Sequence, residues 1–393
     1  MKKLLMAAMA SALVATPAMA AEVKIGVLLG FTGPAESIAP DMAAAAELAI
    51  KEVSDSGALL GGHTVTSVRG DSTCIDSGAA IALAERAITS DNVDGIMGAL
   101  CSGATTSILE NVAMAKGVAM ISPSATSPRL SDLEDNDLFF RTAPSDARQG
   151  QVIADMLNEK GFKSAAITYT NNDYGKGLAD SIERNFVASG GTVTINASHE
   201  DGKADYGAEV GALAQAGGDI LIVAGYQDQG GKGIIQASLD SGAFDMFFLP
   251  DGMIGPNLPT AIGPDLDGAI GIVPGTDSPG AAKLSDMAAA NGFAAGPFAA
   301  ESYDAAALLL LAMQAAGSTD ANVYKEKVMM VANAPGEKIY PGELAKALQI
   351  IADGGDVDYV GASAVELIGD GESAGNYREI LVKGGENTTV GYR

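Results

Sequence analysis

The chain has 393 residues and a formal net charge of −25, and 47% of its residues are hydrophobic although only 5% are aromatic. A strongly acidic chain lacks the positive surface that binds nucleic acid, so this class of function is excluded. The length suits two domains of ordinary size, with cores built mainly from aliphatic side chains.

The first twenty residues carry the pattern of an export signal. Lys2 and Lys3 form a positively charged start, Leu4 to Val14 form an apolar stretch, and residues 18–20 are small enough for a cleavage site. A membrane anchor is the alternative, but the apolar stretch falls short of the roughly 20 residues that a span needs. We therefore expect a signal peptide at residues 1–20, cleaved after Ala20.

Beyond this signal, short apolar runs alternate with Ala-rich helical segments. The first run, VKIGVLL, is almost continuously apolar, which is typical of a parallel strand buried on both faces. Repeated alternation of strand and helix predicts a doubly wound parallel sheet. We expect strand 23–29, helix 41–53, strand 64–68, helix 77–88, strand 94–97, helix 102–115 and strand 118–121.

A second α/β lobe follows residues 122–141, which interrupt the alternation with Pro123, Pro128 and several polar residues. The pattern resumes at Ser145. We expect helices at 145–160, 175–188, 206–216, 231–241 and 299–316, with strands at 164–170, 192–196, 220–224, 246–249 and 269–273. Two lobes of the same kind imply a cleft between them, because open α/β sheets bind ligands at the carboxyl ends of their strands.

No later segment predicts direct insertion into a membrane. Residues 305–316 form the longest apolar window after the signal, and this is the length of a helix in a protein core.

Two cysteines and two histidines restrict the chemistry. In an exported protein a bond between Cys74 and Cys101 is the expected state, and two free buried thiols are the alternative. Closing the loop between them stabilises the fold by about 3–4 kcal/mol on the chain-entropy argument. His63 lies in a glycine-rich turn and His199 in a polar loop, so we expect both at the surface. No spacing of His, Cys and Glu matches a metal site, and we expect no cofactor.

Polar residues follow several of the predicted strands. Cys101-Ser102-Gly103 opens a helix, where unpaired N–H groups and the positive end of the dipole favour an anion. Ser102 and Thr126 can grip a carboxylate through hydroxyl and backbone N–H groups, and Asp251 can pair with an ammonium. Helix capping and turn formation remain the alternative explanation of Ser102 and Thr126.

Enzyme signatures are missing from the sequence. Gly30-Phe31-Thr32-Gly33 is not a dinucleotide fingerprint, and neither a phosphate-loop lysine motif nor a nucleophile elbow occurs. The serines have no histidine arranged to activate them. The pattern indicates a binding protein and not an enzyme. A secreted hydrolase is the alternative, and the two poorly placed histidines argue against it.

Several motifs occur in a characteristic order: Cys74, Leu100-Cys101-Ser102, the ISPSATSP run at 121–128, DYGKG at 173–177 and Gly225-Tyr226. Together they resemble the periplasmic leucine/isoleucine/valine-binding proteins of ABC importers, and the likeness covers essentially the whole mature chain. The resemblance implies the type I periplasmic binding fold, two doubly wound α/β lobes joined by a three-segment hinge. It also implies a first lobe of residues 21–145 plus about 276–378 and a second of residues 146–275 plus about 379–393.

The resemblance also implies a ligand site when the family's residues are carried over by position. Ser102 and Thr126 would hold an α-carboxylate, while the carbonyl of Ser124 would take the α-ammonium together with Asp251. The remaining expected ligand residues are Tyr174 and Tyr226 from the second lobe, Phe298 at the side-chain pocket, Ala125 and Ile38. The family also bonds cysteines at the positions of Cys74 and Cys101.

Three of these positions depart from the family pattern. Asp251 stands where the family often has glutamate, Ile38 falls near the place of an aromatic lid, and Ser124 replaces alanine. A contact through the backbone carbonyl of residue 124 survives the last change.

The function implied by the resemblance is capture of leucine, isoleucine or valine in the periplasm. The lobes would close about the hinge on the bound amino acid, and the closed form would deliver it to an ABC permease. Two alternatives keep the fold: a different ligand, such as an amide, a urea, an aromatic acid or a polar amino acid, or a role as a periplasmic sensor.

Overall fold

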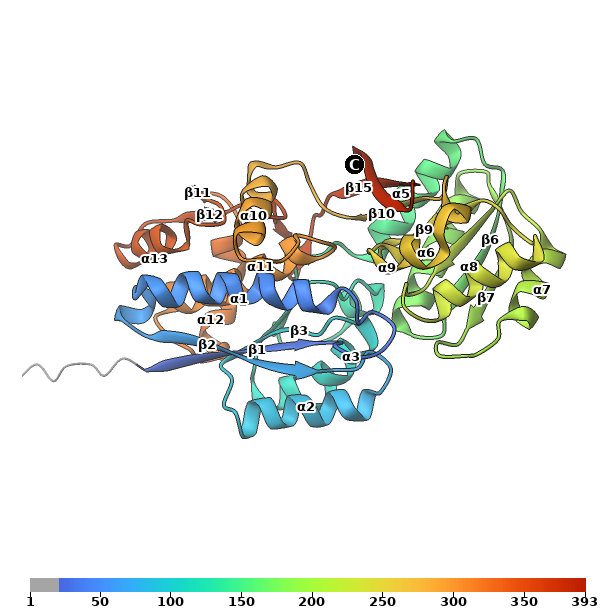
Figure 1. The fold of residues 1–393 in the computed structure, drawn as a ribbon. Helices are drawn as coiled ribbons and strands as arrows, with labels where there is room; N and C mark the ends of the chain where they lie inside the picture. Colours follow the sequence, from blue (N-terminus) through green and yellow to red (C-terminus); the bar gives the residue numbers. More distant parts are fainter. Residues whose placement is uncertain (1–20) are drawn as a thin grey trace, which may run out of the picture.

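The computed structural model describes residues 21–393, so the expected signal peptide lies outside the described residues. Two α/β lobes lie side by side (Figure 1). One contains the N-terminal strands together with the orange helices of the late sequence, and the other contains the green and yellow middle of the chain. The two sheets have separate hydrogen-bond ladders.

The first lobe is built on a parallel sheet with the strand order β2-β1-β3-β4-β5. Its central strand β1 is buried along almost its whole length, as a strand covered by helices on both faces must be. The strands are β1 (Glu22–Leu29), β2 (Thr64–Asp71), β3 (Gly95–Gly98), β4 (Met120–Ser122) and β5 (Phe139–Arg141). The helices between them are α1 (Ala39–Ser56), α2 (Ser77–Thr89) and α3 (Ser102–Ile108), which continues through a π-type turn (Leu109–Ala113) into α4 (Met114–Lys116).

The late sequence returns to cover this lobe. Helix α11 (Ala299–Ala316) is buried from Ala299 to Met313 except for Ala300, because it is mostly apolar and packs between α1 and neighbouring helices. The other elements here are α10 (Pro279–Ala290), α12 (Ala321–Ala332), α13 (Leu344–Ala352), and the strand pairs β11 (Glu337–Ile339) with β12 (Val357–Tyr359) and β13 (Leu367–Ile368) with β14 (Glu372–Ser373).

The second lobe holds a seven-stranded sheet with the order β16-β15-β10-β9-β8-β6-β7. Its first five strands along the chain run parallel, and the C-terminal hairpin adds two antiparallel strands at one edge. The strands are β6 (Ser164–Thr170), β7 (Thr192–His199), β8 (Ile220–Ala224), β9 (Phe247–Leu249), β10 (Ile270–Pro274), β15 (Tyr377–Lys383) and β16 (Glu386–Tyr392). The helices are α5 (Asp146–Glu159), α6 (Asp173–Ala188), α7 (Gly207–Ala216), α8 (Gly230–Ser241) and α9 (Asn257–Ile262).

The chain passes between the two sheets after β5, after β10 and again between β14 and β15. The predicted architecture of two doubly wound α/β lobes is thus confirmed. The predicted strands and helices coincide with observed elements to within a few residues. Sequence patterning missed β5, α9, α10 and all of the elements after residue 316, including the two strands that complete the second sheet.

The predicted disulfide is confirmed, and the predicted surface position of one histidine is wrong. Cys74 and Cys101 form a disulfide with their Cα atoms 5.2 Å apart, so the free-thiol alternative is wrong. The expectation of a surface position for His199 is also wrong, because it is only 1% exposed. Strand β7 extends to His199, whose Nδ1 lies 2.9 Å from Thr168 Oγ1, and burial lowers the pKa of His199 to about 4.

No helix within residues 21–393 combines the length and the apolar character needed to cross a membrane.

Candidate functional site

A small cavity lies between the lobes at the carboxyl ends of their strands. Its volume of about 20 Å³ is the space of roughly one water molecule. An amino acid is several times larger, so it can enter only when the lobes move apart. The walls are formed by Ala35, Ile38, Leu100, Cys101, Ser102, Ser124, Tyr174, Tyr226, Asp251, Gly252 and Phe298.

All but two of the predicted ligand residues line this cavity. The exceptions, Ala125 and Thr126, are fully buried in the loop that continues from Ser124. The residues that sequence reasoning missed are Ala35, Leu100, Cys101 and Gly252. Three of these are chain neighbours of predicted residues, so their position at strand ends was the available signal.

The first-lobe wall is centred on the start of α3. Cys101 is the N-cap residue in extended conformation and makes no side-chain cap bond. The hydroxyl of Ser102 accepts a hydrogen bond from the backbone N–H of Ser127 at 3.1 Å, so it ties two loops together and does not cap the helix. Free N–H groups of the first helical turn therefore remain at this wall.

The loop after β4 is held by its own serines. Ser122 Oγ donates to the carbonyl of Ala99 (2.7 Å) and accepts from the N–H of Ala125 (2.9 Å), and Ser124 Oγ donates to the carbonyl of Leu100 (2.8 Å). Thr126 Oγ1 is buried without a hydrogen-bond partner among the described residues. The Thr126 hydroxyl lies toward the Asp146 carboxyl and opposes the rise in the pKa of that group.

The second-lobe wall of the cavity contains the acidic side chain of Asp251. Asp251 follows β9 and is 1% exposed, and its Oδ1 accepts hydrogen bonds from Tyr174 Oη (2.7 Å) and from the N–H of Gly252 (2.8 Å). Tyr174 stacks on Tyr226 with ring centroids 5.1 Å apart. Burial raises the pKa of Asp251, although the bond from Tyr174 opposes that rise. Burial also raises the pKa of both tyrosines well above the ordinary value, so they stay neutral donors.

A second buried carboxylate stands behind the cavity and was not predicted. Asp146 is fully buried at the start of α5, and its Oδ1 accepts a bond from Gln149 Nε2 at 3.2 Å. The other end of Gln149 accepts from the N–H of Asp251 at 3.4 Å, so the amide bridges the two acidic residues. Burial and the charge of Asp251 raise the pKa of Asp146 well above its usual value. Two buried carboxylates favour a cationic group at this end of the site.

Contacts across the mouth of the cleft join the lobes on two sides. On one side Ser127 Oγ donates to the carbonyl of Asp173 (3.0 Å), and Arg129 pairs with the Asp173 carboxylate (3.5 Å). On the other, Asp228 Oδ2 accepts from the N–H of Ser37 at 3.0 Å. The structure is therefore the closed arrangement of the two lobes.

Within residues 21–393 no group of three or more His, Cys, Asp and Glu side chains is placed to hold a metal ion. The first-lobe wall supplies hydrogen-bond donors, the second-lobe wall supplies a carboxylate, and apolar side chains line the same cavity. This arrangement can bind a small zwitterion.

Comparisons with known proteins agree with this geometry. Residues 22–330 match the sequence model of a family described as periplasmic binding protein. The chain is 30% identical to Leu/Ile/Val-binding protein homolog 1 of Brucella melitensis over 318 residues, which cover 78% of this chain and 83% of the relative.

Two solved structures are similar in fold. A leucine-binding protein of Thermotoga maritima aligns with a TM-score of 0.80 at 22% identity, over 94% of this chain and 98% of that one. A solute-binding protein of an ABC transporter from R. palustris, in complex with benzoate, aligns with a TM-score of 0.76 at 19% identity, over 94% and 96%. Proteins of this fold thus bind both amino acids and aromatic acids.

Proposed function

This chain belongs to the periplasmic binding protein family, and on that premise we propose that it captures leucine, isoleucine or valine between its lobes. The observation that carries the proposal is the pairing of opposite walls in one cavity. The helix start at Ser102 offers N–H donors, and Asp251 offers a buried carboxylate. These are the two receptors that an α-amino acid needs, one for each charged end.

The apolar part of the cavity sets the class of side chain in this proposal. Ile38, Leu100 and Phe298 line the same cavity and are almost fully buried. An aliphatic side chain buried against them gains hydrophobic free energy, whereas a charged side chain would lose its hydration without finding a partner. A branched aliphatic amino acid therefore fits these walls better than an acidic or basic one.

Binding proceeds in the proposal by closure of the lobes about the three crossings. The first lobe comprises residues 21–145 and about 276–378, and the second comprises residues 146–275 and about 379–393. A ligand that touches Ser102 on one lobe and Asp251 on the other favours the closed state, because only that state makes both contacts. The closed protein then delivers the amino acid to an ABC permease. This role requires export to the periplasm, with cleavage after Ala20.

Titration calorimetry with protein freed of carried-over ligand tests the proposal. Leucine, isoleucine and valine should each bind, and glutamate and lysine should bind at least about tenfold more weakly because their charged side chains find no partner. Benzoate and 4-hydroxybenzoate are the informative comparison, since they carry a carboxylate but no ammonium. Binding of benzoate with no binding of the three aliphatic amino acids would replace the proposal with an aromatic acid receptor.

A further inference from the structure

The loop that forms part of the first-lobe wall, residues 124–127, is fixed by hydrogen bonds on several sides. Its N–H groups bond to two serine hydroxyls, Ser122 Oγ from Ala125 (2.9 Å) and Ser102 Oγ from Ser127 (3.1 Å). The carbonyl of Thr126 accepts from the N–H of Asp146 at 2.8 Å. Two of the other carbonyls, those of Ala125 and Ser127, need donors as well, and that of Ser127 accepts from the N–H of Leu130 at 3.2 Å.

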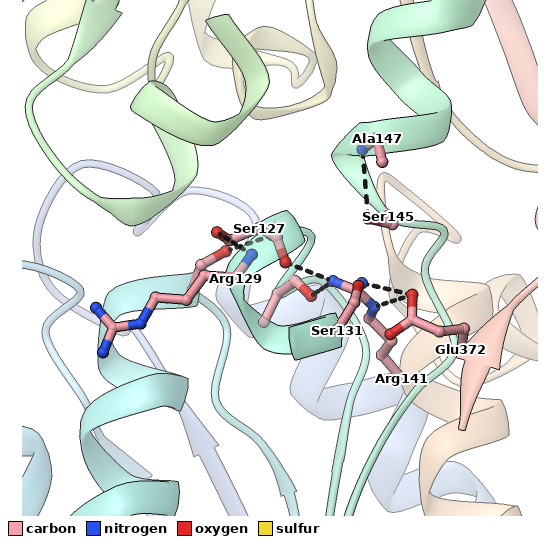
Figure 2. Close-up of polar contacts among 9 residues, drawn as sticks. Ser127, Arg129, Ser131, Arg141, Ser145, Ala147 and Glu372 are labelled. Carbon is pink, nitrogen blue, oxygen red and sulfur yellow. Dashed lines mark hydrogen bonds and ion pairs between the residues drawn. The ribbon is translucent and has the colours of Figure 1, made fainter. Parts of the chain in front are cut away.

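Both of those carbonyls accept from one guanidinium. Arg141 Nη1 donates to the carbonyl of Ala125 at 3.2 Å and to that of Ser127 at 2.9 Å. Nη2 donates to Ser131 Oγ at 2.6 Å and to Glu372 Oε2 at 2.5 Å, and Nε donates to the same oxygen at 3.0 Å. These bonds use all of the N–H donors of the side chain, which is 0% exposed. Figure 2 shows Arg141 between the 127–131 turn and Glu372.

The ion pair also lies where the chain leaves the first lobe. Arg141 ends β5, directly before the first crossing, and Glu372 begins β14, directly before the third. A parallel bridge between Pro144 and Ser373 joins the two crossings just beyond the ion pair. One buried side chain therefore connects the 124–127 loop with two of the three crossings.

We propose that Arg141 is a positioning residue for ligand recognition, held in place by Glu372. It pulls the loop carbonyls away from the cavity and leaves the N–H of Thr126, for which no bond is found among the described residues, for the ligand carboxylate. It does not touch the cavity itself. Lysine cannot replace it, because a single ammonium cannot reach two carbonyls and a carboxylate in the geometry of the planar fork. This inference rests on the proposed function for its ligand.

The test compares leucine with leucinamide, which keeps the ammonium but has no carboxylate. Wild-type protein should prefer leucine strongly. In Arg141→Lys the affinity for leucine should fall about tenfold while that for leucinamide changes little, so the ratio of the two affinities falls by about the same factor. Glu372→Gln should lower the ratio of the two affinities less than Arg141→Lys does. If Arg141→Lys does not fold, the ratio in Glu372→Gln tests the proposal. Arg393→Lys, an arginine whose partners Glu159 and Glu379 lie outside the cleft, is the matched control and should leave the ratio unchanged.

An unchanged ratio in both Arg141→Lys and Glu372→Gln would overturn the inference, even if both variants lost stability, because a purely structural residue would weaken both ligands alike. Hydrogen exchange of the ligand-free protein separates this failure from failure of the proposed function. If wild-type protein binds no amino acid, faster exchange at residues 124–127 in Arg141→Lys still supports positioning by Arg141. Equal exchange in the two proteins would refute it.

Discussion

Buried carboxylates in the core of the first lobe and beside the cleft differ in how many of their oxygens accept hydrogen bonds. In the first lobe, Asp304 accepts from Tyr359 Oη (2.8 Å), from the N–H of Ala362 (2.8 Å) and from the N–H and hydroxyl of Ser363 (2.7 and 2.6 Å). Both of its oxygens are therefore occupied. Beside the cleft, the hydrogen bonds found for Asp251 and Asp146 reach only Oδ1 of each, and Asp146 Oδ2 is buried without a partner among the described residues.

Because Asp304 and Asp251 are both buried and only Asp304 has both oxygens bonded, burial of an acidic side chain does not by itself identify a binding site. Asp304 is a completed structural group, whose surroundings already supply all of the donors that its charge requires. Asp251 is incomplete, because the hydrogen bonds found for it leave Oδ2 unused, and a ligand ammonium in the cavity that Asp251 lines would supply what is missing. Four experiments test whether the carboxylates beside the cleft differ from Asp304 in this way.

The largest effect is expected from Asp251→Asn. The amide keeps the shape of the side chain but removes its charge, so the affinity for leucine should fall about 100-fold or more. Stability should not fall, because the variant has one buried charge fewer. Calorimetry and thermal unfolding of the same preparation measure the two quantities. Leucine affinity equal to that of the wild type would remove Asp251 from the site.

The matched substitution Asp304→Asn should have the reverse profile. Its amide nitrogen would face N–H donors, which leaves one of them buried without an acceptor and lowers the free energy of unfolding by about 1–3 kcal/mol. Leucine affinity should stay within about twofold of the wild type, since Asp304 does not line the cavity. Urea unfolding measures the change in stability and calorimetry measures the affinity for leucine. A loss of affinity as large as that in Asp251→Asn would show that the two carboxylates do not differ in function.

Stability and affinity should respond to pH in opposite directions. Burial raises the pKa of Asp304 to about 6 and that of Glu301 to about 7. The folded state then holds protons that the unfolded chain has released. The lowered pKa of His199 opposes this trend, but the two acids outweigh the one histidine, so stability of the ligand-free protein should fall as the pH rises from about 4 to about 7.

Affinity for leucine should instead rise with pH, by at most about tenfold per pH unit, because Asp251 must be ionised to pair with the ammonium and burial raises its pKa. Urea unfolding and calorimetry across this range test both slopes. An affinity that does not rise with pH would contradict the assignment of Asp251 as the group that receives the ammonium.

A smaller effect is expected from removing one hydroxyl at each carboxylate. Tyr174→Phe removes the donor to Asp251 and should weaken leucine binding about five- to tenfold. Tyr359→Phe removes the corresponding donor to Asp304 and should lower the free energy of unfolding by about 1 kcal/mol with no change in affinity. Equal affinities of the two variants would show that the cleft carboxylate is as complete as Asp304.

Much of the fold was predictable because buried parallel strands leave a plain pattern in the sequence. Continuous apolar runs such as that of β1 predicted the strands, and strand ends predicted the positions of Ser102, Ser124 and Asp251. The later sequence was not predictable in this way. Strands β15 and β16 alternate only partly between buried and exposed residues, and they lie at the edge of a sheet whose other strands occur at least a hundred residues earlier.

Asp146 and Arg141 show the same limit at the site. Each is a single charged residue at the end of an element, and nothing in the local sequence distinguishes it from a charge exposed to solvent. Only the folded chain buries Arg141 against the carbonyls of Ala125 and Ser127, and only the folding of the second lobe sets Asp146 beside Asp251, with Gln149 bonded to both. His199 was misplaced for the same reason, because its burial depends on the length of β7 and on the residues packed over it.

By itself the sequence determined the number and kind of lobes, the disulfide partners and the loops that reach the cleft, because all of these follow from hydrophobic periodicity, cysteine number and chain order. The tertiary structure alone decided which charges are buried together and which of their hydrogen bonds are satisfied. These depend on contacts between residues far apart in the chain, and no local pattern encodes them.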